Sequence, residues 1–363
     1  MKNSIGTSVI LTVFGESHGP AVGVVLDGLA QGLPVDKSYI AEQLARRRPA
    51  GPADTARVEP DRFQLVSGVH EGRTTGTPLT ILIPNENVRS ADYAAVQTVA
   101  RPSHADYTAQ AKYHGFQDPR GGGHFSGRVT AGIVAAGAIC RQALAAKGIR
   151  LGTHILRCAG VEDAPFTDVA SELDRIEAKR FPLIRDVEEQ VEAAVLAAKS
   201  EQDSVGGVIQ TGICGLPAGL GEPWFDSLEG VLARAAIAVG GVKGIEFGDG
   251  FGLAALRGSQ ANDPFRMQDG RVVTSTNRNG GINGGITNGM PVVFNLAVKP
   301  TPSISRPQQT VDFVQGKDVE LALTGRHDPA IIRRICPVVT ALTAVVLCDQ
   351  LALRFGTDYL ATV

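Results

Sequence analysis

The sequence lacks the features that mark several large classes of protein. Its 363 residues carry a formal net charge of −2, so there is no basic excess of the kind a general nucleic-acid binder needs. Its five cysteines are scattered without a CxxC pair, which fits reduced thiols in a cytoplasmic protein and gives no zinc site. The N-terminal residues lack a signal-peptide cleavage pattern, and no apolar stretch looks long enough to span a membrane. We therefore expect a cytoplasmic protein that binds neither nucleic acid nor membrane.

Hydrophobic periodicity predicts strands and helices along the first half of the chain. Two β-like runs, 7–13 and 21–26, flank the tight polar turn GESHG. A helix is expected from Asp36, as its N-cap, to Arg48, and a buried helix from Thr130 to Lys147. The strand IRLGTHIL should follow this second helix.

The second half adds helices and further strands in an irregular order. One helix is expected around Val191 and Val195, and another from Asp226, where Glu229 completes a capping box. Strands are expected at GVIQTGI and PVVFNLAV, and Pro337 should interrupt an apolar stretch that is otherwise helical. The regular alternation of strand and helix that builds a parallel sheet is absent. The pattern therefore favours the α+β class with antiparallel sheets.

The stretch PRGGGHFSGR, residues 119–128, has the composition of an anion-binding loop. Three glycines expose backbone N–H groups just before a helix begins, and Arg120 and Arg128 add positive charge. No lysine follows the glycines as in a P-loop, and the GxGxxG pattern is missing. Three glycines alone would fit a structural turn equally well. The two arginines favour a functional loop.

Two histidines stand where proton-transfer residues could lie. His18 follows Ser17 on the turn between the first two strands, and His104 comes three residues after Arg101. Histidine gives up or takes a proton near neutral pH, so this set suits chemistry beside a phosphorylated substrate. An isolated histidine is more often structural, and we interpret three others in that way: His70, His114 and His154.

Other charged residues have a structural and a functional interpretation. Asp328 precedes a proline, as an ordinary N-cap does, yet a carboxylate at a helix entrance can also face a ligand. Lys299 ends an apolar strand, where it could contact phosphate or simply be solvated. The run Arg46–Arg48 suits the end of a helix, and we expect one of these side chains, not all three, to face a cleft.

Nine stretches together resemble the motifs of the chorismate synthase family, in the family's order and over nearly the whole chain. They are FGESHG, LARRRP, RPSHADYT, RGGGxxSGRxTAG, GLPAGLGEPxFD, VKGIEFGDGF, GGINGGITNG, VKPTPSI and GRHDP. The resemblance implies one domain over residues 1–363, with a helical layer sandwiched between two antiparallel sheets, and a homotetramer. It also implies a lyase of the shikimate pathway: 5-enolpyruvylshikimate 3-phosphate loses phosphate in an anti 1,4-elimination to give chorismate. The family requires reduced FMN, and since no extra domain for NADPH is evident we expect an external flavin reductant.

The resemblance also implies roles for individual residues. His18 would protonate the departing phosphate, His104 would stabilise the reduced flavin, and Asp328 would act near flavin N5, with Ser17 as a supporting donor. The substrate's charges would be bound by Arg47, Arg48, Arg101 and Arg128. Flavin contacts would fall on His124, Phe125, Ser126, Gly240, Gly241, Gly284, Lys299, Pro300, Thr301, Pro302, Ser303 and Arg326. No metal is implied.

The chain departs from the family pattern at three places. His124 stands where many members have an arginine, Gly240 and Gly241 replace a common Asn-Ala pair, and Ala53 lies where an arginine is often found. We expect these changes to alter flavin affinity rather than abolish the reaction. Two alternatives remain: a flavin-binding or phospholigand-binding protein without turnover, and a metal-dependent hydrolase, for which the sequence offers no HxxxH spacing.

Overall fold

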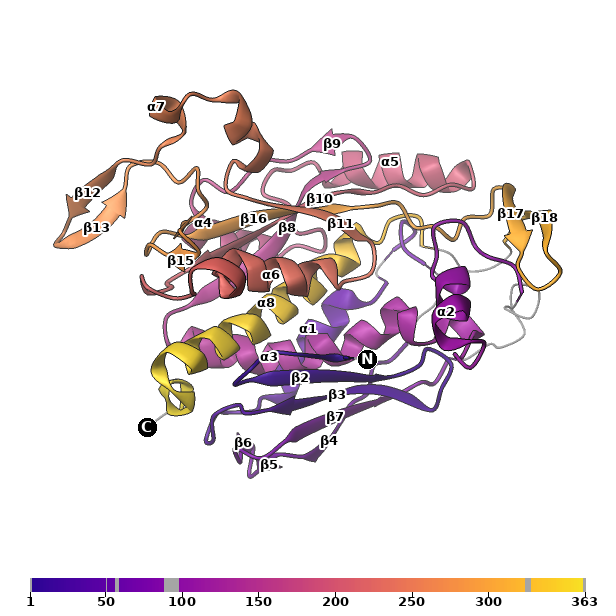
Figure 1. Cartoon of the computed structure of the whole chain (residues 1–363), viewed down its shortest axis with the longest axis horizontal. Helices are drawn as coiled ribbons and strands as arrows, with labels where there is room; N and C mark the ends of the chain where they lie inside the picture. The colour runs from indigo at the N-terminus through magenta and orange to yellow at the C-terminus, as the bar shows by residue number, and fades with distance from the viewer. Residues whose placement is uncertain (1, 50, 56–58, 88–97, 324–327, 362–363) are drawn as a thin grey trace.

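The computed structural model describes residues 2–49, 51–55, 59–87, 98–323 and 328–361. Over these residues the chain builds two five-stranded antiparallel sheets (Figure 1). The first has the order β1 (Ser4–Ile5), β2 (Ile10–Gly15), β3 (Ala21–Asp27), β7 (Leu79–Pro84), β4 (Gln64–Ser67). The second has the order β11 (Val242–Phe247), β16 (Val292–Val298), β10 (Gly207–Cys214), β8 (Arg150–Cys158), β9 (Val161–Glu162). The predicted α+β class with antiparallel sheets is confirmed.

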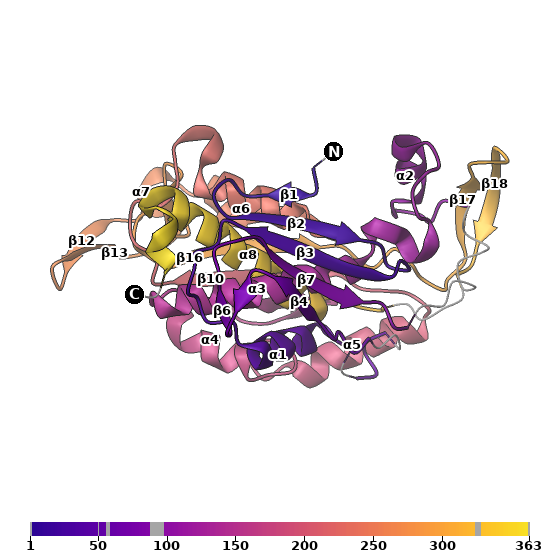
Figure 2. The same cartoon turned by 90° about the horizontal axis from the view of Figure 1, so that it is seen from below.

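One group of helices lies between the two sheets, and two helices lie outside it, one against β8 and β10 and the other beside the edge strand β9 (Figure 1). The inner helices are α1 (Lys37–Arg47), α3 (Thr130–Ala146), α6 (Leu228–Ile237) and α8 (Ile332–Phe355); the outer ones are α4 (Val169–Glu177) and α5 (Glu188–Ser200). From below, β2, β3 and β7 pass in front of α3 and α8 (Figure 2). One cluster of buried apolar side chains extends from Val9 to Ala361 and joins both sheets to the inner helices.

Short elements complete the described chain. Helix α2 (Asp106–Tyr113) and the hairpin β17 (Gln308–Asp312) and β18 (Lys317–Leu321) extend from the same end of the molecule (Figure 1). The remaining strands and α-helix are the strand pairs β5 (Val69–His70) with β6 (Arg73–Thr74), β12 (Phe265–Gln268) with β13 (Arg271–Thr274), and β14 (Ile282–Asn283) with β15 (Ile286–Thr287), and the four-residue α7 (Gly258–Ala261).

Local signals explain the two helices that bear on the site. The Asp36 side chain accepts hydrogen bonds from the N–H groups of Ser38 and Tyr39, at 2.8 and 3.2 Å, so it caps α1 as predicted. Helix α3 packs closely on α8 because Gly137 has no side chain. A Cβ there would lie 2.3 Å from the Cβ of Ala341. The predicted turn between β2 and β3 is also confirmed, since the two strands pair antiparallel from Ile10 to Gly15.

Two helices differ from the prediction. Helix α6 is capped by Ser227, whose Oγ accepts from the Gly230 N–H at 3.0 Å, while Asp226 ends a short 3-10 turn. Helix α8 runs from Ile332 to Phe355 with Pro337 as its sixth residue, so the expected interruption is wrong. Asp328 does not cap α8, which begins at Ile332.

The expectation about apolar stretches is wrong. Two helical segments, Gly127–Ala146 and Ile332–Phe355, are long and apolar enough to cross a membrane by length and composition. Both are mostly buried inside the fold, 67% and 94% respectively in their most apolar windows. Burial on all sides requires apolar residues around the whole helix, which accounts for this composition.

Candidate functional site

Two adjoining cavities lie at the end of the molecule where the glycine-rich loop meets α3. The larger has a volume of about 750 Å³ and lies among β2, the start of α3, the end of α6 and the first turns of α8. The smaller, about 260 Å³, lies among the C-terminal end of α1 and the glycine-rich loop. Both are lined by Arg47, His104, Phe125, Ser126, Gly127, Ser303, Ile331 and Arg334. The two cavities therefore form adjacent compartments of one site.

The glycine-rich loop packs directly on the two histidines that the sequence singled out. Gly121, Gly122 and Gly123 have φ angles of 60°, 83° and 53°, a conformation that favours glycine. A Cβ on Gly121 would lie 2.2 Å from His18 Nδ1, and one on Gly122 would lie 3.3 Å from His104 Cε1. Gly121 and Gly122 thus allow the loop to approach the histidines closely, and Gly123 allows it to approach the Asp118 carbonyl.

His18 and Ser17 lie buried on the turn between β2 and β3. The Nδ1 atom of His18 is 3.3 Å from Ser17 Oγ, and the Ser17 N–H donates to the carbonyl of Gly123 at 3.0 Å. His18 lines neither cavity itself. It touches Gly121, which lines the smaller one. His18 therefore lies directly beside the smaller cavity, against one of its lining residues.

His104 lines both cavities and is held by Asp106. Its Nδ1 atom lies 2.9 Å from Asp106 Oδ1, and Arg101 donates to the same carboxylate from Nε and Nη2 at 2.8 and 2.7 Å. Because the ionised carboxylate of Asp106 can only accept hydrogen bonds, we assign a proton to Nδ1 of His104, which leaves Nε2 for the cavity. Burial alone would raise the pKa of Asp106, but the hydrogen bonds from Arg101 and His104 outweigh it and hold the pKa well below its usual range.

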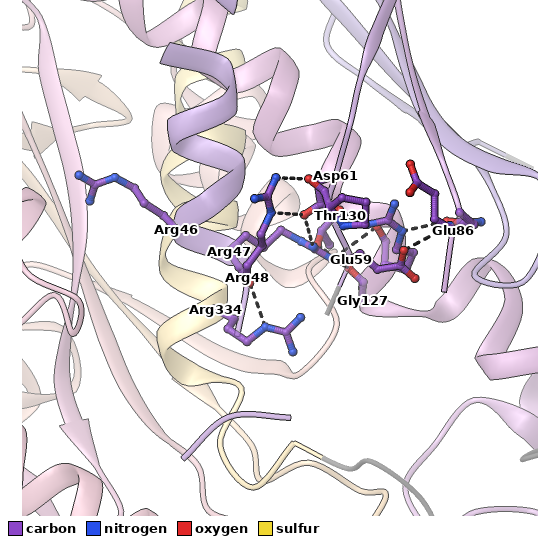
Figure 3. Close-up of polar contacts among 12 residues, drawn as sticks. Arg46, Arg47, Arg48, Glu59, Asp61, Glu86, Gly127, Thr130 and Arg334 are labelled. Atoms are coloured by element: carbon purple, nitrogen blue, oxygen red, sulfur yellow. Dashed lines mark hydrogen bonds and ion pairs between the residues drawn. The ribbon is translucent and has the colours of Figure 1, made fainter. Parts of the chain in front are cut away.

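Arg47, Arg48 and Arg128 converge on the buried carboxylate of Asp61. Figure 3 shows Arg47 and Arg48 pointing toward Asp61, whereas Arg46 points to the opposite side. The Oδ2 atom of Asp61 is 3.7 Å from Arg47 Nη1 and 3.5 Å from Arg48 Nε, and Arg128 Nη1 donates to Oδ1. Two arginines of the run therefore face the smaller cavity, while Arg46 lines a separate one, so the expectation that only one of the three would face a cleft is wrong.

The first turn of α8 fixes the arginine run and holds Asp328. Arg334 donates from Nε to the carbonyl of Arg47 at 2.9 Å and from Nη1 to the carboxylate of Asp328. Arg333 donates to the carbonyls of Arg46 and Arg48 at 3.2 and 2.6 Å. Burial raises the pKa of Asp328, although Arg334 opposes the shift. Its Oδ1 atom has no hydrogen-bond partner in the described part of the chain.

The larger cavity collects most of the residues that the resemblance assigns to flavin. Its lining includes His124, Phe125, Ser126, Gly240, Gly241, Lys299, Pro300, Thr301, Pro302 and Ser303. His124 Nδ1 donates to the Gly15 carbonyl at 2.8 Å, and Lys299 Nζ donates to the Ser103 carbonyl at 2.6 Å. Gly284 lies in the β14–β15 hairpin and lines neither cavity. Arg326 is outside the described residues.

Other charged side chains take structural positions. His154 is buried, with Nε2 3.2 Å from Gln210 Oε1, and His70 is exposed. His114 ends α2 in a left-handed conformation. Arg120 pairs with Asp118 at 2.9 and 2.8 Å and lines neither cavity, so the charge expected from it is not at the site. Among the described residues, no group of three His, Cys, Asp or Glu side chains could hold a metal ion.

Sequence reasoning missed the residues that orient this site. Asp61, Asn85, Asp106 and Arg334 were not singled out, although each bonds a residue that was. Only Asp106 carried a local signal, since it follows His104 by two residues in the same motif. Asn85 accepts from Arg128 Nε at 2.9 Å across 43 positions of the chain.

Comparison with known proteins decides the family. A family model described as chorismate synthase matches residues 9–352. The chain belongs to the chorismate synthase family. Its members are carbon–oxygen lyases, so the chain is an enzyme of that class.

Relatives named chorismate synthase cover nearly the whole chain. The one from Opitutus terrae is 48% identical, over 96% of this chain and 96% of its own. Those from Aeropyrum pernix and Pyrococcus abyssi are 45% and 44% identical, covering 97% and 96% of this chain and 93% and 97% of their own. A solved structure titled "Crystal Structure of Chorismate Synthase" superposes with a TM-score of 0.77 at 26% identity, over 97% of this chain and 94% of that one.

Proposed function

We propose that the chain converts 5-enolpyruvylshikimate 3-phosphate into chorismate by anti 1,4-elimination of phosphate, with reduced FMN as cofactor. The observation that carries the proposal is the pairing of a large, mainly apolar cavity with a smaller one lined by Arg47, Arg48 and Arg128. A planar ring system suits the first, and an anionic leaving group suits the second.

The residues around the larger cavity fit a flavin. Leu11, Val13, Ile133 and Val338 are apolar side chains among those that line it. The hydroxyl Oγ1 of Thr301, also in the lining residues, is buried without a hydrogen-bond partner among the described residues, and such a group calls for one from a ligand. When bound, reduced FMN would supply electron density to the substrate as phosphate departs.

The chain's own residues would bind the leaving group and move protons. Arg47, Arg48 and Arg128 would neutralise the charge that builds up on the phosphate, which arginine does best where water is excluded. His18 would supply a proton to the phosphate, supported by Ser17 Oγ at 3.3 Å. Ionised Asp328 would accept one, because burial with a raised pKa makes its carboxylate a stronger base than an exposed one.

His104 would act on the flavin side of the site. Asp106 fixes the ring and the proton on Nδ1, so that Nε2 is available to a group in the larger cavity. Arg101 would act mainly through this arrangement, since three of its N–H groups donate to Asp106. Lys299, Thr301, Ser303 and the glycines at 240 and 241 would hold the flavin.

The remaining properties are carried over from the family. We propose one domain over residues 1–363, with the helices between the two sheets forming the family's sandwich. We further propose a homotetramer, a cytoplasmic location and an external flavin reductant. Gly284 and Arg326 stay in the proposed flavin-binding set.

An anaerobic assay tests the reaction. The protein is mixed with chemically reduced FMN and 5-enolpyruvylshikimate 3-phosphate, and chorismate absorbance and released phosphate are followed together. We expect both in equal amounts, and no product with oxidised FMN. Flavin binding without product formation would reject the lyase proposal in favour of a binding protein.

A further inference from the structure

Asp61 is a buried carboxylate on which three arginines of the smaller cavity converge. Its side chain is fully buried, and it contacts Arg47 and Arg48 from the end of α1 and Arg128 from the turn before α3. These four residues therefore hold three positive charges against one negative charge. The cluster keeps a positive excess facing the cavity that all four line.

The backbone at Asp61 indicates that its position is imposed by the surrounding structure. Its φ angle is 51°, in the left-handed region that residues other than glycine rarely adopt. Non-glycine residues held in that region collect at functional sites, where the surroundings fix them. Pro60, which precedes it, accepts a hydrogen bond from Arg48 Nη2.

The arginines do not depend on Asp61 alone for their orientation. Arg47 donates to Thr130 Oγ1 at 3.0 Å and to the Gly127 carbonyl at 2.8 Å. Arg128 donates to Asn85 Oδ1 at 2.9 Å and to the Pro84 carbonyl at 3.1 Å. These oxygens are neutral, so they fix the geometry without cancelling charge.

Asp61 does not form hydrogen bonds with all the N–H groups of the arginine cluster. Its Oδ2 atom and Arg48 Nε lie 3.5 Å apart, and neither has a hydrogen-bond partner among the described residues. The carboxylate thus lowers the net charge of the cluster by one and still leaves the N–H group of Arg48 Nε without an acceptor among the described residues.

We propose that Asp61 is a positioning residue that serves as a fixed counter-charge for the three arginines. It weakens their hold on an anion enough for inorganic phosphate, the leaving group of the reaction proposed above, to depart after each turnover. The inference rests on that proposed function only for the identity of the anion.

Binding of inorganic phosphate tests this inference without any turnover. In Asp61→Asn the amide oxygen can still accept from Arg128, but the negative charge is gone. We expect phosphate to bind about tenfold more tightly by calorimetry at constant ionic strength, because one opposing charge has been removed a few ångströms away. An unchanged or weaker affinity would overturn the proposal, since a purely structural role would loosen the arginines.

Two further variants separate local charge from other effects. Asp318→Asn removes one charge from an exposed position on β18 and should leave phosphate affinity unchanged. An equal gain in both variants would reject a local role for Asp61. Asp61→Glu retains the charge, and we expect its phosphate affinity to stay within about twofold of the unmodified protein.

The Arg48→Gln background covers the case in which Asp61→Asn does not fold. Only two guanidinium groups then share the site, and adding Asp61→Asn should again tighten phosphate binding. No tightening in this pair would overturn the inference.

Turnover by Asp61→Asn adds a kinetic signature. Slower phosphate release predicts that kcat and KM fall together, whereas splayed arginines would raise KM. Absence of chorismate from the unmodified protein would reject the proposed function and leave the phosphate comparison valid. The two failures are therefore distinguishable.

Discussion

His104 and Asp106 form a half-buried pair in which Nδ1 and Oδ1 lie 2.9 Å apart. The same carboxylate accepts from Arg101, so one acidic side chain orients a histidine and an arginine together. Carboxylate–histidine pairs of this kind set the tautomer and the orientation of the ring. The proposed function of His104 therefore depends on a residue that lines neither cavity.

Asp106→Asn should reduce kcat/KM by about 10- to 100-fold, because the amide can present either an acceptor or a donor to Nδ1 and weakens the hold on Arg101. The variant should still fold, since an amide of the same shape replaces the carboxylate. Anaerobic turnover at several flavin concentrations measures the change. Asp358→Asn, on a distant 3-10 turn, is the control, and an equal loss there would contradict the argument.

His18→Ala should lower kcat by about 100- to 10,000-fold, the range expected for loss of a general acid. Gly121 packs against the imidazole, so the loop has to be checked for order by near-ultraviolet circular dichroism. The matched control is His70→Ala, which truncates an exposed histidine on β5. A turnover above half of the control's would remove His18 from the proton-transfer step.

His124→Ala should weaken flavin binding more than it slows turnover at saturating flavin. The imidazole donates to the Gly15 carbonyl at 2.8 Å and lines the larger cavity, but it lies outside the arginine cluster. We expect a loss of about 1 kcal/mol in flavin binding, close to that of one hydrogen bond. Fluorescence titration with FMN measures it, and an unchanged dissociation constant would exclude His124 from the flavin site.

Asp328→Asn should abolish most activity while making the protein more stable at neutral pH. Burial raises the pKa of Asp328 in the folded state, so its ionisation opposes folding above the ordinary carboxyl range near pH 4. The amide removes that penalty, a gain on the order of 1 kcal/mol at pH 7 that should vanish below about pH 4. Urea unfolding at pH 4 and pH 7 measures it, and a variant less stable at pH 7 would contradict this sign.

Local sequence predicted the elements whose determinants are close together along the chain. Asp36 caps α1 because its carboxylate reaches N–H groups two and three residues ahead. Asp226 and Ser227 are both residue types that commonly cap helices. The sequence predicted Asp226 as the N-cap of α6, but the cap is Ser227. The 3-10 turn at Trp224–Asp226 makes Ser227 the residue at the helix entrance.

Site residues in short motifs were predicted from the sequence, and site residues with distant partners were not. His18, His104 and the arginine run were found because each lies in a short motif of chemically distinctive residues. Asp61 and Arg334 were missed, since their partners lie far away in the sequence. Arg334 donates to the carbonyl of Arg47, which lies 287 positions away along the chain. The hydrophobic periodicity of the sequence cannot predict a contact over that separation.

The antiparallel α+β class, the capped start of α1, the glycine loop and the family motifs could be read from the amino-acid sequence, because each depends on residue type over a short span. The continuous helix through Pro337 and the contacts of Asp61 with three arginines became evident only in the folded chain. Both depend on packing and charge between segments that folding alone brings together. The reactive groups of the site therefore lie in short sequence motifs, whereas several of the residues that orient them lie far away along the chain.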